Sequence, residues 1–134
     1  MLCTTVCKVV GVAFIAAGIW GFIDGERVLV FHVNTLHNIV HLTSGLVAVA
    51  CGFGTFSAAR WFCSIFGLVY GAVAVMGFMN VEPVVTRLHL NEADNWLHAC
   101  IAAALLVAAA VDCVRRNPQV FAHHDAARPR PTLP

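Results

Sequence analysis

One polar stretch occurs twice in the chain, as HVNTLHNIVH at His32–His41 and as HLNEADNWLH at His89–His98. Four positions keep the same residue type in both copies, namely His32 and His89, Asn34 and Asn91, Asn38 and Asn95, and His41 and His98. Asp94 replaces His37 in the second copy. Each copy stands directly before a long apolar run, which the pattern predicts to be a membrane helix. Polar groups therefore cluster where two of the predicted helices begin.

The composition indicates an integral membrane protein. Of the 134 residues, 60% are hydrophobic and 11% are charged, and the mean hydropathy is +0.81, whereas soluble domains carry about a quarter charged residues. The apolar residues fall into four blocks, each close to the roughly 20 residues that cross hydrocarbon as a helix. The sequence predicts an all-α bundle of four transmembrane helices over residues 1–116, with helices at about 2–23, 36–56, 61–79 and 94–114. Residues 117–134 are predicted to form a disordered cytoplasmic tail, because prolines, arginines and histidines replace the apolar run.

The duplication extends beyond the polar stretch. Gly11 and Gly21 of the first apolar run recur as Gly67 and Gly77 of the third run, at a repeat of about 56 to 57 positions. Each unit would cross the membrane twice, so both units would have the same orientation. The sequence therefore predicts two parallel two-helix repeats about an axis along the membrane normal, with both polar stretches at one membrane face.

The distribution of positive charge predicts the orientation. Short cytoplasmic loops are rich in Lys and Arg, and one side of the predicted bundle holds Lys8, Arg60, Arg115, Arg116 and the arginines of the tail. The other side holds only Arg27 and Arg87. Both termini are therefore predicted to be cytoplasmic, in an integral protein of the cytoplasmic (inner) membrane, with the polar stretches outside. Besides the lipid bilayer, no partner is indicated by charge, and no basic stripe suggests nucleic acid.

The polar residues have the spacing of a possible metal site. His37 and His41 are four residues apart, as are Asp94 and His98, so each pair lies on one face of its helix. If the repeat axis brings these faces together, His37, His41, Asp94 and His98 converge. Three imidazoles and a carboxylate suit zinc, copper or iron, with His32 and His89 as possible outer ligands.

Three other readings of the same residues stay open. Asn34 and Asn91 have N-cap positions, and with Asn38 and Asn95 they could form a purely structural hydrogen-bond network. His41 and His98 could instead ligate a haem from facing helices. A proton or ion pathway is a further alternative. No nucleophile motif accompanies the histidines, so the sequence does not predict an enzyme.

Small size, short loops and rows of small residues suggest a second class of function. The protein could be an accessory or assembly subunit of a larger membrane complex, or a homo-oligomer. The six cysteines form no Cys-x-x-Cys pair, and they are interpreted as small buried hydrophobes.

The chain resembles a family of small bacterial four-helix membrane proteins known as a domain of unknown function. The resemblance rests on Asn34–Leu42 followed by Gly45, and on Asp94–His98. It covers the four helices and not the tail. It implies a bacterial cytoplasmic membrane location, but it supplies no activity, cofactor or partner, so the functional hypotheses depend on the residues themselves.

Overall fold

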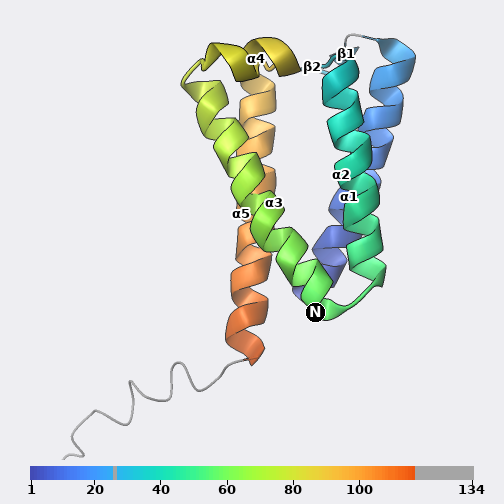
Figure 1. Ribbon diagram of the computed structural model, residues 1–134, viewed down its shortest axis with the longest axis vertical. Coiled ribbons are helices and arrows are strands. Elements are labelled where there is room, and N and C mark those ends of the chain that lie inside the picture. Colours follow the sequence, from blue (N-terminus) through green and yellow to red (C-terminus); the bar gives the residue numbers. More distant parts are fainter. Residues whose placement is uncertain (26, 117–134) are drawn as a thin grey trace, which may run out of the picture.

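The computed structural model describes residues 1–25 and 27–116, which form a helical bundle with one small hairpin (Figure 1). In chain order the elements are α1 (Leu2–Asp24), β1 (Arg27–Val28), β2 (Phe31–His32), α2 (Thr35–Phe53), α3 (Phe56–Phe78), α4 (Glu82–Leu88) and α5 (Glu92–Arg116). The helices α1, α2, α3 and α5 are each long and apolar enough to cross a membrane. The predicted all-α bundle of four long apolar helices is thus confirmed. The predicted tail, residues 117–134, lies outside the described residues.

The surface of the bundle is apolar, whereas much of its interior is built from small side chains. Ile23 is 79% exposed, Phe53 74% and Leu68 66%. The buried core includes the small residues Cys3, Cys7, Ala48, Ala59, Cys63, Ala102, Ala108 and Ala109. Such a surface suits hydrocarbon rather than water, and small interior residues let helix backbones approach one another in lipid. The chain is a multi-pass membrane protein.

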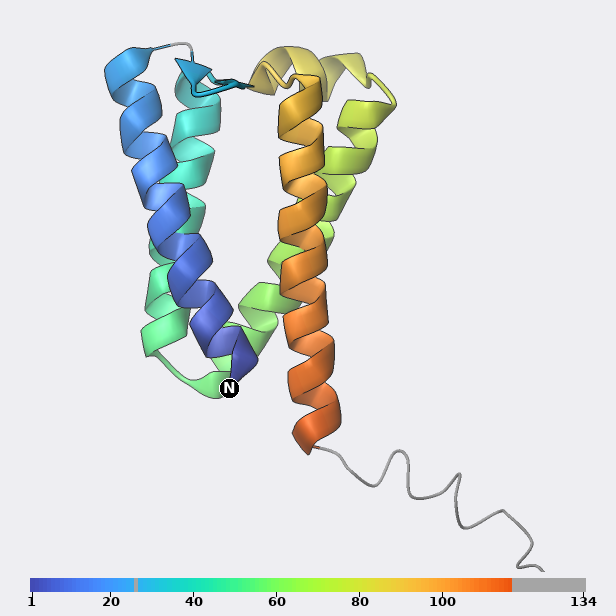
Figure 2. The same ribbon diagram turned by 180° about the vertical axis from the view of Figure 1, so that it is seen from behind.

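The four long helices form two antiparallel pairs, α1 with α2 and α3 with α5. Figure 2 shows from the opposite side that α4 and the hairpin lie across one end of the bundle, whereas α1 begins and α5 ends at the other end. Both pairs therefore start at the same end. The internal repeat and the cytoplasmic position of the termini stay predictions.

Within each pair, an asparagine side chain lies against a glycine of the neighbouring helix. Asn38 of α2 lies against Gly21 of α1, and Asn95 of α5 lies against Gly77 of α3. In both contacts the amide oxygen occupies the space that a Cβ would need, so only glycine fits there. Both amide oxygens are buried and have no hydrogen-bond partner among the described residues. Asn38 and Asn95 therefore pack within their own helix pairs, and the amide oxygens do not join them across the bundle.

The start of α3 differs from the sequence expectation by more than one helical turn. Helix α3 begins at Phe56 rather than near residue 61, because the Thr55 side chain accepts a hydrogen bond from the Ala58 amide (3.2 Å) and caps the helix. Pro83 lies in the first turn of α4, where proline is tolerated because the missing amide hydrogen would have no intrahelical acceptor.

The two outer connections contain structure that the sequence analysis did not predict. The first is the β1–β2 hairpin, in which Arg27 pairs with His32 and Val28 with Phe31. The second is α4, which lies across the end of the bundle and is followed by His89 in the left-handed conformation (φ 53°) at its C-cap. Both elements are too short for hydrophobic periodicity to identify them.

Asn34 and Asn91 connect the two halves of the bundle through these connections. The Oδ1 of Asn34 accepts from the His37 amide at the start of α2, and its Nδ2 donates to the Arg87 carbonyl (2.7 Å). The Oδ1 of Asn91 accepts from the Asp94 amide at the start of α5, and its Nδ2 donates to the Val30 carbonyl (2.9 Å). Each asparagine thus caps one helix and contacts the connection of the other pair.

At the opposite end, a carboxylate of α5 caps α1. The two oxygens of Asp112 accept from the backbone amides of Leu2 (3.1 Å) and Cys3 (2.8 Å). These amides belong to the first turn of α1, where no intrahelical acceptor exists. Asp112 is only 3% exposed, so this contact fixes the start of the first helix against the end of the last described one.

Candidate metal centre

Three histidines meet between α2 and α5 at the end of the bundle that carries the hairpin. His37 and His41 come from successive turns of α2, and His98 comes from α5. Their side chains are 1%, 7% and 3% exposed, respectively. One ring nitrogen from each residue lies within 4.8 Å of the corresponding nitrogens of the other two. Around a tetrahedral ion with metal–nitrogen bonds of about 2.0 Å, such nitrogens are about 3.3 Å apart, so the rings would have to move closer together to bind one ion.

Several ring nitrogens of this cluster have no hydrogen-bond partner. The Nδ1 atoms of His41 and His98, and both nitrogens of His37, are buried and have no partner at good hydrogen-bond geometry among the described residues, although the backbones of His32 and Leu88 lie near the His37 ring. A buried polar group without a partner is costly, and more so where the surroundings are apolar. The cluster therefore contains more lone pairs and N–H groups than the surrounding protein satisfies.

Aromatic rings pack against the cluster from two sides. Phe14 of α1 stacks on His41, with ring centroids 5.2 Å apart and planes 3° apart. Tyr70 of α3 stacks on His98 at 5.4 Å, and its hydroxyl lies 3.0 Å from the Ser44 hydroxyl. All four long helices thus contribute to the site, and the stacking restricts the orientation of the two imidazoles.

Asp94 does not join the histidines, although the sequence analysis expected it as a fourth ligand. Its Oδ2 accepts from the Asn91 amide (2.9 Å), while its own amide donates to Asn91 Oδ1. This reciprocal arrangement is a capping box, in which the acid turns back towards the start of its own helix. The group of residues that could hold an ion contains the three histidines and not Asp94.

The two outer histidines also lie apart from the cluster. His32 is exposed on β2, where its Nε2 is 3.2 Å from the Nη2 of Arg27. His89 is exposed at the end of α4. Their earlier interpretation as possible outer ligands has no support from this geometry, because neither belongs to the convergent group.

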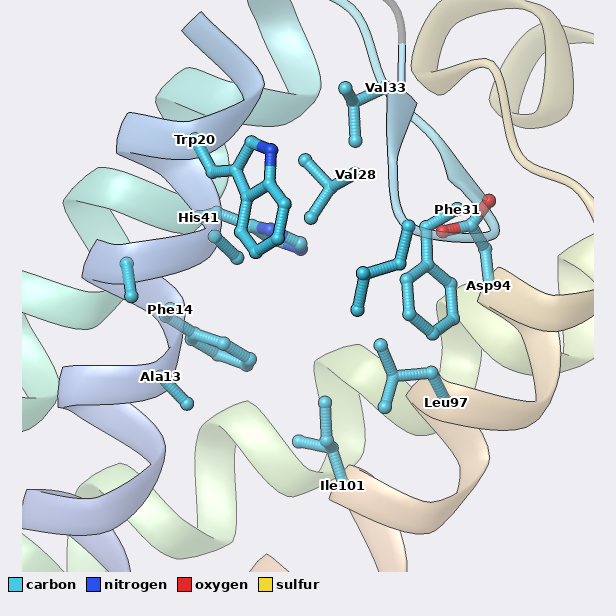
Figure 3. Close-up of a pocket in the computed structure, with 13 residues that line it drawn as sticks. Ala13, Phe14, Trp20, Val28, Phe31, Val33, His41, Asp94, Leu97 and Ile101 are labelled. Carbon is cyan, nitrogen blue, oxygen red and sulfur yellow. The ribbon is translucent and has the colours of Figure 1, made fainter. Parts of the chain in front are cut away.

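A cavity of about 280 Å³ adjoins the cluster between α1 and α5, beneath the hairpin (Figure 3). Phe14 and Trp20 line it from α1, Phe31 from the hairpin, and Leu97 and Ile101 from α5. His41 and Asp94 are the ionisable side chains in its wall. The cavity is therefore largely apolar and reaches one of the three clustered histidines.

Comparison with known proteins shows the family. The family described as Domain of unknown function (DUF4383) matches residues 4–111. The chain belongs to this family. No curated protein and no solved structure matches this DUF4383 chain. The matched residues include the three histidines and the aromatic rings that pack on them.

Some parts of the site in this DUF4383 protein were not found from sequence. Tyr70, the only tyrosine in the chain, stands inside an apolar run, and this isolation was the available signal. No comparable signal marked Phe14, because the chain contains nine phenylalanines. Away from the site, the Sγ atoms of Cys7 and Cys63 lie 3.6 Å apart in the core, where α1 packs against α3.

Proposed function

We propose that this protein binds one transition-metal ion in the membrane through His37, His41 and His98. The observation that supports the proposal most is the convergence of three buried imidazoles, of which His41 and His98 each have a buried Nδ1 without a hydrogen-bond partner among the described residues. A neutral imidazole is a good ligand through either ring nitrogen. Three protein ligands around one ion leave a coordination position for water or another molecule, as in catalytic rather than structural zinc sites.

The donor set favours zinc or copper over iron. Imidazole suits all three metals, but open non-haem iron sites commonly combine two histidines with a carboxylate. Asp94, the nearest candidate for that carboxylate, is engaged by the Asn91 amide. A site of three imidazoles without a carboxylate is left, and zinc and copper both bind such sites.

The available space favours an ion over a haem. The cavity that His37, His41 and His98 line together has a volume of about 60 Å³. Pockets for drug-sized ligands begin at about 300 Å³, and a haem is at least that large. His41 and His98 would be the axial ligands of a haem, and the His37 ring lies close to both of them. Its centroid is 4.5 Å from that of His41 and 5.8 Å from that of His98.

Metal content tests the proposal directly. Protein purified in mild detergent, dialysed and analysed for its elements should contain about one zinc or copper ion per chain. His98→Gln should lose the ion, because glutamine fills a similar space but is a poor ligand for these metals. His89→Gln is the matched control, and it should keep the ion because His89 is exposed and outside the cluster.

A wild-type protein that neither contains metal nor takes up added zinc or copper would contradict the proposal. The histidines would then be packing residues of a membrane accessory subunit, the alternative that the short loops and small size suggest. Equal metal content in His98→Gln and wild type would also contradict it, since the ion would lie elsewhere.

We further propose that the metal site faces outward from the cytoplasmic membrane. Lys8, Arg60, Arg115 and Arg116 support this orientation, because they belong to the early turns of α1 and α3 and to the last turn of α5, which lie at the end of the bundle opposite the hairpin. A reporter that is active only in the cytoplasm should work when fused after Arg116 and stay silent when fused after Glu82. The reverse pattern would invert the topology.

A further inference from the structure

The cavity between α1 and α5 opens towards the lipid. Ala13 and Ala16 of α1 line it, and both are exposed. Trp20 also lines it and is 45% exposed. Since the outer surface of a membrane-spanning helix meets hydrocarbon, a molecule dissolved in the bilayer can enter between the helices without crossing water.

The inner wall of the same cavity offers an unused polar group. His41 is 93% buried, and neither of its ring nitrogens has a hydrogen-bond partner among the described residues; Nδ1 is enclosed by protein, so Nε2 is the nitrogen with accessible surface. Figure 3 shows its imidazole directed from α2 towards the cavity. A purely apolar occupant would leave this nitrogen without a partner, whereas an occupant that carries an oxygen atom would satisfy it.

The volume and the lining of the cavity restrict the kind of molecule that it can bind. A cavity of roughly 150 Å³ accommodates benzene, and this one has about 280 Å³. It can hold one substituted ring, but not a whole phospholipid. The rings of Phe14, Trp20 and Phe31 face the space from α1 and the hairpin, and aromatic side chains pack favourably with the face or edge of another ring.

From these observations we infer that the cavity binds a lipid-soluble ring compound, a quinone or a phenol, whose apolar tail extends into the bilayer and whose ring oxygen hydrogen-bonds to His41. A neutral imidazole has one donor and one acceptor nitrogen. One nitrogen of His41 can therefore meet the ring oxygen while the other remains available to a metal. The inference goes beyond the proposed metal site and does not require the ion.

Fluorescence of Trp20 provides the test. Trp61 and Trp96 are 62% and 59% exposed, so the Trp61→Phe, Trp96→Phe protein should fold and emit only from Trp20. In lipid vesicles, a benzoquinone with a decyl tail should quench this emission in a saturable manner at one quinone per chain. Simple partitioning of the quinone into the lipid would give only a non-saturable component.

Phenylalanine substitutions at alanine positions distinguish quinone binding in the cavity from quinone binding elsewhere on the protein surface. Ala17→Phe, which fills the cavity, should abolish the saturable quenching, and Ala13→Phe should do the same if Ala17→Phe proves unstable on melting. Ala103→Phe adds the same side chain to an exposed position of α5 outside the cavity, and it should leave the quenching unchanged. Equal quenching in all three variants would overturn the inference.

Two further measurements identify the occupant and keep the two proposals apart. Dodecanoic acid should compete poorly with the quinone; equal competition would show that an alkyl chain occupies the cavity and would overturn the ring assignment. His98→Gln should lose metal but keep the saturable quenching, because His98 does not line this cavity. If the wild-type protein showed saturable quenching but bound no metal, only the proposed metal site would be rejected. If it bound metal but showed no saturable quenching, only the proposed binding of a ring compound would be rejected.

Discussion

Replacing Gly77 with alanine is expected to lower the melting temperature of the purified protein by roughly 10 °C. The Asn95 side chain occupies the space of the new Cβ, so α3 and α5 must move apart or Asn95 must leave its position. Overpacking of this kind costs about 1–3 kcal/mol, and each kcal/mol corresponds to several degrees in a chain of this size. Gly21→Ala should behave similarly, since Asn38 occupies the equivalent space on α1. Thermal unfolding followed by circular dichroism measures both.

Gly71→Ala provides the matched control on the same helix. A Cβ at Gly71 would lie 3.7 Å from the Ala102 Cβ, which is an ordinary van der Waals distance. Alanine also favours helix over glycine by about 1 kcal/mol in soluble hosts, so this variant should melt at or above the wild-type temperature. Similar losses in Gly71→Ala and Gly77→Ala would contradict the assigned contact.

A second substitution tests the partner residue. Adding Asn95→Ala to Gly77→Ala removes the side chain that the new methyl group meets. The double variant should therefore be more stable than the sum of the two single effects indicates, because residues in contact show non-additive stability changes. Additive effects would place the strain of Gly77→Ala elsewhere.

Binding of zinc or copper is expected to raise the melting temperature by roughly 10 °C or more at saturating metal. A ligand at about a thousand times its dissociation constant stabilises the state that it binds by about 4 kcal/mol. His98 lies on α5 and its two partners lie on α2, so the complete set exists only when the helices are packed. A chelator should reverse the shift.

The histidine variants distinguish this effect from surface binding. His98→Gln should show no stabilisation by metal, while His89→Gln should respond like the wild type because its side chain lies outside the cluster. If metal raised the melting temperature of His98→Gln by the same amount, the stabilising ion would be bound at another place.

The fold class could be predicted from the sequence because a membrane imposes a simple requirement on its spanning helices. Each spanning helix needs about 20 apolar residues, and the four blocks meet it without any knowledge of their packing. The hairpin and α4 could not be found in the same way, since a two-residue strand or a seven-residue helix leaves no readable period.

The site was predictable only as far as helix geometry extends. The spacing of His37 and His41 places them on one face of α2, and the duplicated stretch led to the expectation that His98 would face them; the three side chains do lie together. Asp94 stands four residues before His98 and three residues after Asn91. The first spacing predicts a shared ligand face with His98, and the second predicts a capping box with Asn91. Sequence alone does not decide between them. In the structure the Asn91 amide, which is local and needs an acceptor, holds the carboxylate.

The cap that Asp112 provides for α1 has a consequence for biogenesis. The Cys3 amide and its acceptor are separated by 109 positions in the chain, and synthesis proceeds from the N-terminus. While the ribosome is still producing α2 and α3, the first turn of α1 has no access to the carboxylate that will receive its amides. Head groups or water must satisfy those amides in the interim. Docking of α5 then supplies the missing acceptor, so that closure of the bundle is coupled to translation of its fourth span. A nascent chain that ends before Asp112 would contain most of α5 and still leave the first turn of α1 without this carboxylate.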